Sequence, residues 1–238
     1  MDRPLDRHSP LLVVAPLADE AEAICRRLAA RGIPWNPGQA GTLTCSLMPS
    51  LDLSIAVGGV GKAQFGVQSQ HLLDHRRDIR LVMCAGGAGQ LSADLSIGDV
   101  VVGTQTIEHD YRERFNPRPP PRYDSDAAVL AQLQQVAAST DLGFRVHFGP
   151  IASGDEDIVD PVRRAEVHEQ TGALCVAWEG SGAARAARFS GVGFVEVRVI
   201  TDAADEKAAE SFHANLEGVM AHVADLLAAW RVSSPQPT

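Results

Sequence analysis

Short runs of apolar, often β-branched residues alternate along the chain with longer stretches in which apolar and polar residues are mixed. The short runs are typical of buried strands, and the longer stretches have the spacing of amphipathic helices. The predicted strands are 11–16, 42–48, 51–57, 81–86, 99–106, 146–153, 174–178 and 194–200. The predicted helices are 19–30, 62–76, 127–138, 161–170, 182–189 and a last one ending near residue 230. This alternation is typical of an α/β fold.

The order of these elements predicts one domain over residues 10–231, with three layers, α/β/α, around a twisted mixed and mostly parallel central sheet. A chain of 238 residues has the usual length for one large domain of this kind. The two ends, 1–9 and 232–238, are rich in polar residues and proline, and we expect them to be flexible tails. Four prolines within residues 114–124 predict a loop or flap.

Composition narrows the classes of function. The formal net charge is −9 at pH 7, which argues against a nucleic-acid-binding surface because such surfaces are normally basic. No apolar run approaches the roughly 18 residues that a membrane-spanning helix needs, and the first residues lack the apolar core of a signal peptide. The partner we expect is a small molecule, with no nucleic acid and no membrane.

The cysteines indicate a compartment. Each stands singly within an apolar or helical stretch, and no CxxC motif is present. The four are Cys25, Cys45, Cys84 and Cys175. They are typical of buried thiols in a cytoplasmic protein, because a disulfide framework or a zinc site needs other spacings. The histidines likewise show no ligand spacing, so neither a metal nor another cofactor is predicted.

Ligands of such folds gather at the carboxyl ends of strands, so the residues that follow each strand carry the candidate chemistry. After the first strand comes a helix whose first turn holds Asp19, Glu20 and Glu22. Acids there stabilise the helix macrodipole, and this segment alone favours that interpretation. Two further strands end in glycines, in GGVGK at 58–62 and AGGAG at 85–89. They allow either a tight turn or a close approach of a ligand to the backbone.

Two other strand ends carry charge. Glu179 follows an apolar strand in WEGSG. It is either an ordinary acid at a helix start or an acceptor for a pair of hydroxyl groups. Arg198 stands inside the strand VEVRVI, and Asp202 follows it. Because a buried charge is costly unless it is paired or used, these two residues indicate either a structural ion pair or chemistry.

Together these segments resemble one family. The order DE, GGVGK, AGGAG, GDVVV, HD, SGD, WEG and RVITDAAD, from about residue 11 to 230, is similar to the nucleoside phosphorylase and nucleosidase superfamily. It is most similar to the methylthioadenosine/S-adenosylhomocysteine nucleosidase branch. The resemblance implies the nucleoside phosphorylase-like fold and cleavage of the glycosidic bond of a purine nucleoside through an oxocarbenium-like ribosyl cation. It also implies a homodimer, with the pair His109 and Asp110 close to the interface.

The resemblance assigns catalytic roles to two carboxyls. Asp202 matches the aspartate that protonates or hydrogen-bonds N7 of the leaving base, and a poor leaving group does need a general acid beside it. Glu20 matches the glutamate that activates the attacking water on the opposite face of the ribose, an arrangement like that of inverting glycosidases. Arg198 is expected to orient either that aspartate or the network facing the ribose.

The resemblance also implies a set of substrate-binding residues. Glu179 matches the residue that holds the 2′- and 3′-hydroxyls of the ribose. Phe212 matches an aromatic residue that lines the pocket of the 5′ substituent. The other members of the predicted site are Gly86, Gly87, Trp178, Asp157 and Ile158.

Three features depart from the family pattern. Asp157 stands where adenine-specific relatives place an aromatic residue against the base, and a carboxylate cannot stack as a ring does. Either the base is not adenine, or Trp178 or a loop residue supplies the stacking. Gly87 stands where those relatives carry a serine near the water, which predicts a roomier site. The proline-rich segment 116–122 is peculiar to this chain and is expected to cap the 5′ pocket or to lie in an interface.

Three hypotheses for the function follow. The leading one is an enzyme that hydrolyses the N-glycosidic bond of a purine nucleoside with a modified 5′ position. The first alternative is a phosphate-dependent phosphorylase of the same fold. It needs a cationic cradle, which AGGAG does not supply but to which Arg198 and Lys62 could contribute. The second alternative is a nucleoside-binding protein without activity. The presence of Glu20, Glu179 and Asp202 together argues against it, because binding alone does not need the acid that activates water.

Overall fold

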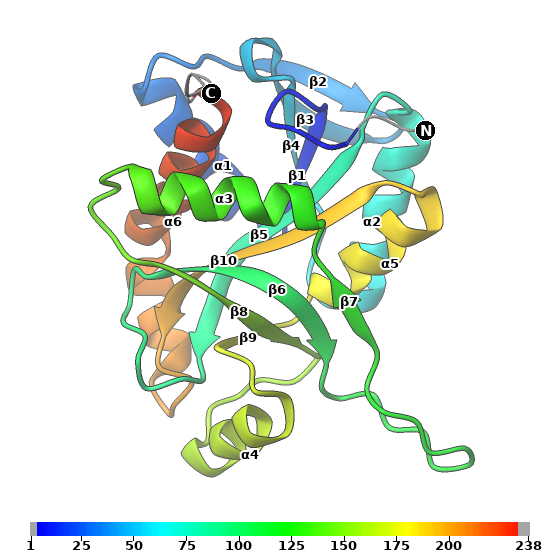
Figure 1. The fold of residues 1–238 in the computed structure, drawn as a ribbon, viewed down its shortest axis with the longest axis vertical. Helices are drawn as coiled ribbons and strands as arrows, with labels where there is room; N and C mark the ends of the chain where they lie inside the picture. Colours follow the sequence, from blue (N-terminus) through cyan, green and yellow to red (C-terminus); the bar gives the residue numbers. More distant parts are fainter. Residues whose placement is uncertain (1–3, 233–238) are drawn as a thin grey trace.

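Ten strands form one mixed sheet between two groups of helices in the computed structural model, which describes residues 4–232 (Figure 1). The strands are β1 (Leu11–Ala15), β2 (Asn36–Ala40), β3 (Leu43–Met48), β4 (Leu53–Val57), β5 (Leu81–Gln90), β6 (Val100–Glu108), β7 (Arg122–Asp124), β8 (Val146–Ser153), β9 (Cys175–Ala177) and β10 (Gly193–Asp202). The helices are α1 (Ala18–Ala30), α2 (Lys62–His75), α3 (Ala127–Ser139), α4 (Pro161–Thr171), α5 (Gly180–Ser190) and α6 (Ala208–Val232). The predicted α/β fold class is confirmed.

The sheet has an open half and a closed half. In the open half, β5, β1, β4, β3 and β2 follow one another. In the closed half, β5 also pairs with β10 and β9, and β10, β6, β8 and β9 pair in turn, so that five strands form a ring. The ten-residue β5 permits this because its first half pairs with β1 and its last residues pair with β9. The parallel strands β4, β1, β5 and β10 all end at one side of the sheet.

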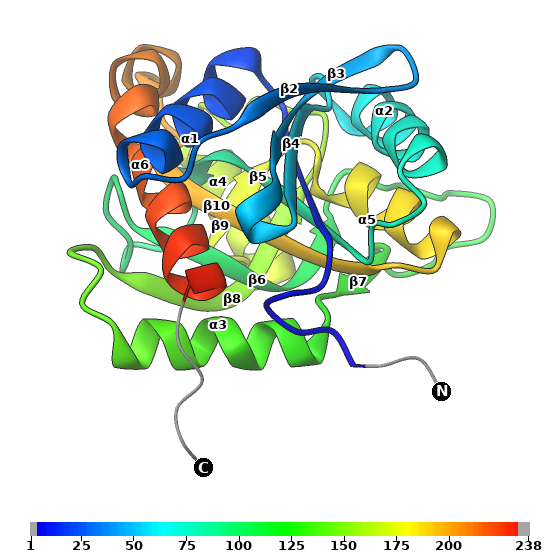
Figure 2. The same cartoon turned by 90° about the horizontal axis from the view of Figure 1, so that it is seen from above.

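Helices cover both faces of the central strands, which confirms the predicted three layers (Figure 2). α1 packs with α6 on one face, and α2 packs with α5 on the other. Side chains of β1 alternate between the two cores: Leu11 and Val13 belong to the first, and Leu12 and Val14 to the second. This is the period of two that a strand buried on both faces requires.

Two edge strands were missed by sequence analysis. β2 has the sequence NPGQA, and β7 lies at the end of the proline-rich segment 114–124. Neither shows the alternation of a half-buried strand, and each is held by pairing with one neighbour, β3 or β6. The predicted strands 42–48 and 51–57 form a hairpin, since β3 and β4 pair in antiparallel fashion around a 3₁₀ turn at Pro49–Leu51.

The predicted tails fall partly outside the described residues. Within them, Leu5 packs against the core, and its carbonyl accepts a hydrogen bond from Nε2 of Gln132 at 3.0 Å. Near the other end, Arg231 donates to the carbonyls of Leu51 and Ser9, each at 3.0 Å. No helix within residues 4–232 has the length and apolar character needed to cross a bilayer.

α2 and α5 approach so closely that Gly182 has no room for a side chain. A Cβ atom there would overlap the backbone carbonyl oxygen of Lys62 and lie 3.1 Å from the backbone nitrogen of Gly66. We predict that Gly182→Ala lowers the free energy of unfolding by about 1–3 kcal/mol, because one of the two helices must shift. Urea unfolding measures the change.

Gly218→Ala in α6 is the matched control for this prediction. A Cβ atom there meets no atom within 4 Å, and alanine is the better helix former by about 1 kcal/mol. We therefore expect this variant to be at least as stable as the parent protein. Equal stabilities of the two alanine variants would show that the helices are not in such close contact.

Candidate active site

A cavity of about 410 Å³ lies where β1, β5, β9 and β10 end. Nine of the ten predicted site residues line it: Glu20, Gly87, Asp157, Ile158, Trp178, Glu179, Arg198, Asp202 and Phe212. The tenth, Gly86, lies next to the lining, against the side chains of Glu20 and Arg198. The fold therefore brings together residues that are far apart in the sequence.

Glu20 lies in the first turn of α1 and is buried. Its Oε2 accepts a hydrogen bond from the N–H of Leu17 at 2.9 Å, the return bond of a helix start. Its Oε1 accepts from the N–H of Gly87 in β5 at 2.8 Å. Burial raises the pKa of Glu20 to about 7 against the opposing effect of these two bonds. The helix-start interpretation thus accounts for one oxygen, and the other binds the backbone of Gly87, which also lines the cavity.

Asp202 ends β10 and is held by its own turn. Its Oδ2 accepts a hydrogen bond from the hydroxyl of Thr201 at 2.8 Å, and its Oδ1 accepts from the N–H of Ala204 at 2.9 Å. Ala204 has a φ of +47°, a left-handed conformation that alanine rarely adopts and that is common at functional sites. Burial raises the pKa of Asp202. Arg198 makes its hydrogen bonds to other groups, so the first of its two predicted roles, orienting this aspartate, is not seen.

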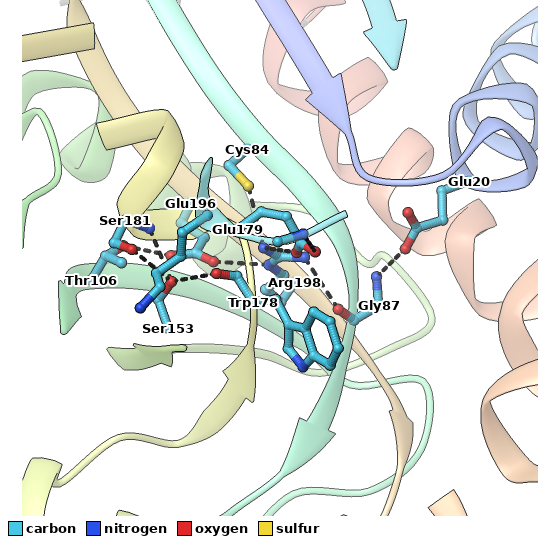
Figure 3. A network of polar contacts seen from close by, with 12 residues as sticks. Glu20, Cys84, Gly87, Thr106, Ser153, Trp178, Glu179, Ser181, Glu196 and Arg198 are labelled. Carbon is cyan, nitrogen blue, oxygen red and sulfur yellow. Dashed lines mark hydrogen bonds and ion pairs between the residues drawn. The ribbon is translucent and has the colours of Figure 1, made fainter. Parts of the chain in front are cut away.

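The guanidinium of Arg198 is 1% exposed and lies between two carboxylates (Figure 3). Its Nε donates to Glu196 at 2.9 Å, and its Nη2 donates to Glu179 at 3.1 Å. Nη2 also contacts Sγ of Cys84, and Nη1 donates to the carbonyl of Gly87, each at 3.3 Å. Arg198 therefore contacts Glu179, the residue that the resemblance assigns to the ribose hydroxyls, and its second predicted role, in the network facing the ribose, stays a prediction.

The turn between β9 and α5 places Glu179. The hydroxyl of Ser153 donates to the carbonyl of Trp178 at 2.9 Å, and the N–H of Ser181 donates to that hydroxyl at 3.0 Å (Figure 3). Oε1 of Glu179 accepts from the N–H of Gly61 at 3.3 Å. The glycine-rich segment GGVGK at 58–62 thus contacts Glu179 through the backbone N–H of Gly61.

The segment 154–160, after β8, forms another wall of the cavity. The indole Nε1 of Trp178 donates to the carbonyl of Glu156 at 3.1 Å, which ties this segment to the turn before α5. Ile158 is buried, whereas Asp157 lines the cavity and stays exposed to solvent. Trp178 lines the same cavity, so an aromatic surface is present in addition to the carboxylate.

Gly86 is the point at which two functional side chains meet. A Cβ atom on it would lie 2.8 Å from Oε1 of Glu20 and 2.9 Å from Nη1 of Arg198. Any other residue would have to displace one of these charged groups. The absence of a side chain here lets the acid and the arginine reach the same stretch of β5.

The prediction of a roomier site at Gly87 is wrong. A Cβ atom there would lie 2.8 Å from Cγ2 of Thr201 and 2.9 Å from the ring of Phe212. These two side chains fill the space that the missing side chain leaves. The sequence showed the glycine but not the neighbours from β10 and α6 that pack over it.

Two polar residues of the Arg198 network were missed. Glu196 stands two positions before Arg198, and the alternation of a strand puts both on one face. Opposite charges at this spacing in an apolar strand are a signal that could have revealed the pair. Thr106 donates from its hydroxyl to Oε2 of Glu196. It offered no such signal, since only the pairing of β10 with β6 brings the two residues together.

Lys62 lies outside the cavity lining. Its Nζ forms ion pairs with Glu108, at 3.2 Å, and with Asp110. The lysine that kept the phosphorylase alternative open is therefore engaged elsewhere. His109, beside Asp110, is buried, and its ring nitrogens have no hydrogen-bond partner within the described part of the chain.

Comparison with known proteins places this site in a family. The chain matches the model of the phosphorylase superfamily over residues 10–230. It is 30% identical over 211 residues to the 5′-methylthioadenosine/S-adenosylhomocysteine nucleosidase of Geobacillus kaustophilus, covering 85% of this chain and 86% of that protein.

Solved structures support the same family assignment. The nucleosidase of the same name from Neisseria meningitidis, in complex with methylthio-immucillin-A, has a TM-score of 0.81 and 25% identity, covering 93% of this chain and 97% of that one. Futalosine hydrolase of Helicobacter pylori has a TM-score of 0.80 at 24% identity, covering 92% and 96%, and shows a likeness of fold. These findings confirm the predicted superfamily, branch and class of activity. The chain belongs to the phosphorylase superfamily, in the branch of nucleosidases that hydrolyse N-glycosidic bonds.

Proposed function

We propose that this protein hydrolyses the N-glycosidic bond of a purine nucleoside modified at its 5′ position, releasing the free base and a ribose derivative. One observation carries the proposal. Glu20 and Asp202, two buried carboxyls with raised pKa, line one cavity together with Glu179. A reaction that needs an acid for the leaving base, a base for water and a grip on the ribose would use these three groups.

Asp202 acts as the general acid in this proposal. A purine leaves badly as an anion, and a proton or hydrogen bond supplied at N7 lowers the barrier. Because burial raises the pKa of Asp202, more of the carboxyl is protonated at a given pH than in water. The Thr201 hydroxyl and the Ala204 N–H limit the directions in which the carboxyl can turn.

Glu20 acts as the general base toward the attacking water. A base is most effective when its pKa lies near the working pH, and burial brings the pKa of Glu20 to about 7. Its two backbone hydrogen bonds, from Leu17 and Gly87, hold the carboxylate still. They come from α1 and β5, so the base is fixed by both elements.

Electrostatics favour water over phosphate as the nucleophile. Positive charge develops on the ribose as the bond breaks, and Glu179 can accept hydrogen bonds from the ribose hydroxyls beside that charge. Among the described residues that line the cavity, Arg198 is the only lysine or arginine, and two carboxylates already pair with it. Phosphate would need free cationic donors.

The 5′ group is proposed to lie beside Phe212. This ring lines the cavity with Ala208 and Ala209, and such a wall suits an apolar substituent. The similar proteins are named for 5′-methylthioadenosine and S-adenosylhomocysteine, both nucleosides modified at this position. Trp178 is the aromatic side chain proposed to contact the base, and Asp157 would accept a hydrogen bond from a donor on the base edge.

A cytoplasmic homodimer is also part of this proposal. All four cysteines are free and buried, which suits a reducing compartment. Large apolar side chains stand exposed at Val60, Val67, Tyr111 and Phe115, and exposed apolar surface commonly marks an interface. Phe115 comes directly before the proline-rich segment 116–122, which supports an interface role for that segment.

The proposed function is tested first by release of free base from a panel of nucleosides. The panel contains 5′-methylthioadenosine, S-adenosylhomocysteine, 5′-deoxyadenosine, inosine and guanosine, each with and without phosphate. We expect release that does not depend on phosphate, with a 5′-modified nucleoside preferred. Release only with phosphate would make the protein a phosphorylase. Binding without release would favour the non-catalytic alternative.

Substitution of either catalytic carboxyl separates chemistry from binding. We expect Asp202→Asn and Glu20→Gln each to lower kcat by about 100-fold or more, the usual contribution of general acid or base catalysis. Calorimetry should still detect nucleoside binding by both variants. Asp205→Asn is the matched control, since that neighbouring acid lies outside the cavity lining and caps the next turn through the N–H of Lys207. Its charge is the smallest of the four effects on the pKa of Asp202. Near-parental rates in either catalytic variant would remove that residue from its role.

The raised pKa of Glu20 predicts a dependence of stability on pH. The folded protein favours the protonated form, so this stabilisation is full below the ordinary pKa of 4.5 and is lost as the pH rises through about 7. Glutamine mimics the protonated form at every pH. The stability advantage of Glu20→Gln over the parent should therefore grow by about 3 kcal/mol between pH 4 and pH 8. Urea unfolding of both proteins at the two pH values measures this, and a constant difference would mean an ordinary pKa.

A further inference from the structure

Glu196 is a buried acid to which the proposed mechanism gives no role. Its side chain is 0% exposed in the middle of β10. Both of its oxygens are engaged: Oε1 accepts from Nε of Arg198 at 2.9 Å, and Oε2 accepts from the hydroxyl of Thr106 (Figure 3). A second carboxylate on an arginine that already has Glu179 as a partner calls for a physical reason.

The backbone around Glu196 is shaped to hold it. A Cβ atom on Gly180 would overlap Oε2 of Glu196, so the carboxylate lies directly against the first residue of α5. The N-terminus of a helix carries partial positive charge, which stabilises a carboxylate beside it. Gly180 follows Glu179 in the chain. Glu196 is thus packed against the turn that positions the ribose-side acid.

The geometry of the guanidinium explains what Glu196 can do. The group is planar, so fixing the direction of Nε fixes the directions of both terminal nitrogens. With Nε of Arg198 held by Glu196, Nη2 is aimed at Glu179, and Nη1 is aimed at the carbonyl of Gly87. Without that hold, rotation of the guanidinium would carry Nη2 away from Glu179.

We propose that Glu196 is a positioning residue for ribose recognition: through Nε of Arg198, it fixes the carboxylate of Glu179 in the orientation that receives the ribose hydroxyls. Thr106 fixes Glu196 in turn. The inference rests on the proposed function for the role of Glu179. It makes Glu196 a determinant of specificity that acts on the substrate through two other residues, Arg198 and Glu179.

The test compares a ribonucleoside with its 2′-deoxy analogue. 5′-Methylthioadenosine offers a 2′-hydroxyl to Glu179, and 2′-deoxy-5′-methylthioadenosine does not. The ratio of kcat/KM for the two therefore reports the contact with Glu179. We expect Glu196→Gln to lower this ratio roughly tenfold, the size of one charge-assisted hydrogen bond. A purely structural role would lower both values together and leave the ratio unchanged.

Three further variants make the result specific. Asp225→Asn removes another buried acid, one that pairs with Arg27 and Arg31 outside the cavity lining. It should leave the ratio unchanged. Thr106→Val removes the hydroxyl that binds Glu196 but leaves the charged carboxylate of Glu196 in place. The ratio should therefore fall, as in Glu196→Gln. Thr106→Ser should restore it. The threonine variants also test the inference if Glu196→Gln fails to fold.

The outcomes separate the two proposals. An unchanged ratio in both Glu196→Gln and Thr106→Val would overturn the positioning role while leaving nucleoside hydrolysis intact. If the parent protein releases no base from any nucleoside, the proposed function is wrong. The position of Arg198 is then read from crystal structures of the parent and the Glu196→Gln variant. A guanidinium that stays in place on Glu179 in the variant would overturn the inference independently of activity.

Discussion

The buried guanidinium of Arg198 is the charge on which the arrangement of the site depends. Removing such an ion from water costs several kcal/mol unless partners compensate it. Glu196 and Glu179 supply that compensation from β10 and from the turn before α5. Because Arg198 and Glu196 both belong to β10, the pair between Arg198 and Glu179 fixes the turn before α5 relative to this strand. The same guanidinium lies close enough to Glu20 to moderate the effect of burial on its pKa.

All of these charged groups are removed from water. This removal lowers the stability of the fold, but it also gives Glu20 the shifted pKa that the proposed chemistry uses. Arg198 is compensated fully and stays charged. Glu20 is compensated only by two backbone N–H groups and by the more distant arginine, so its ionisation is shifted toward neutral pH. The protein gives up some stability at neutral pH in exchange for a base that can gain and lose a proton there. Functional sites commonly show such a trade.

Much of this fold and site could be predicted from the chain because the relevant information is local. Apolar runs located most strands, and strand ends with Glu20, Glu179 and Asp202 located the acids. What could not be predicted depends on long-range pairing. The closed ring requires the end of β5 to pair with β9, and the hold of Thr106 on Glu196 requires β6 beside β10. The filling of space at Gly87 by Phe212 likewise depends on how α6 returns over the sheet.

The ring of strands also determines how molecules can enter and leave. An open sheet can splay at an edge, but a ring cannot widen at one seam without breaking a row of backbone hydrogen bonds. The floor of the cavity is therefore rigid, and its other walls include residues 156–159 after β8 and Ala208 and Ala209 at the start of α6. In an enzyme built this way, motion of the loop after β8 can limit the release of products, and with it the rate of turnover, even when bond cleavage is fast.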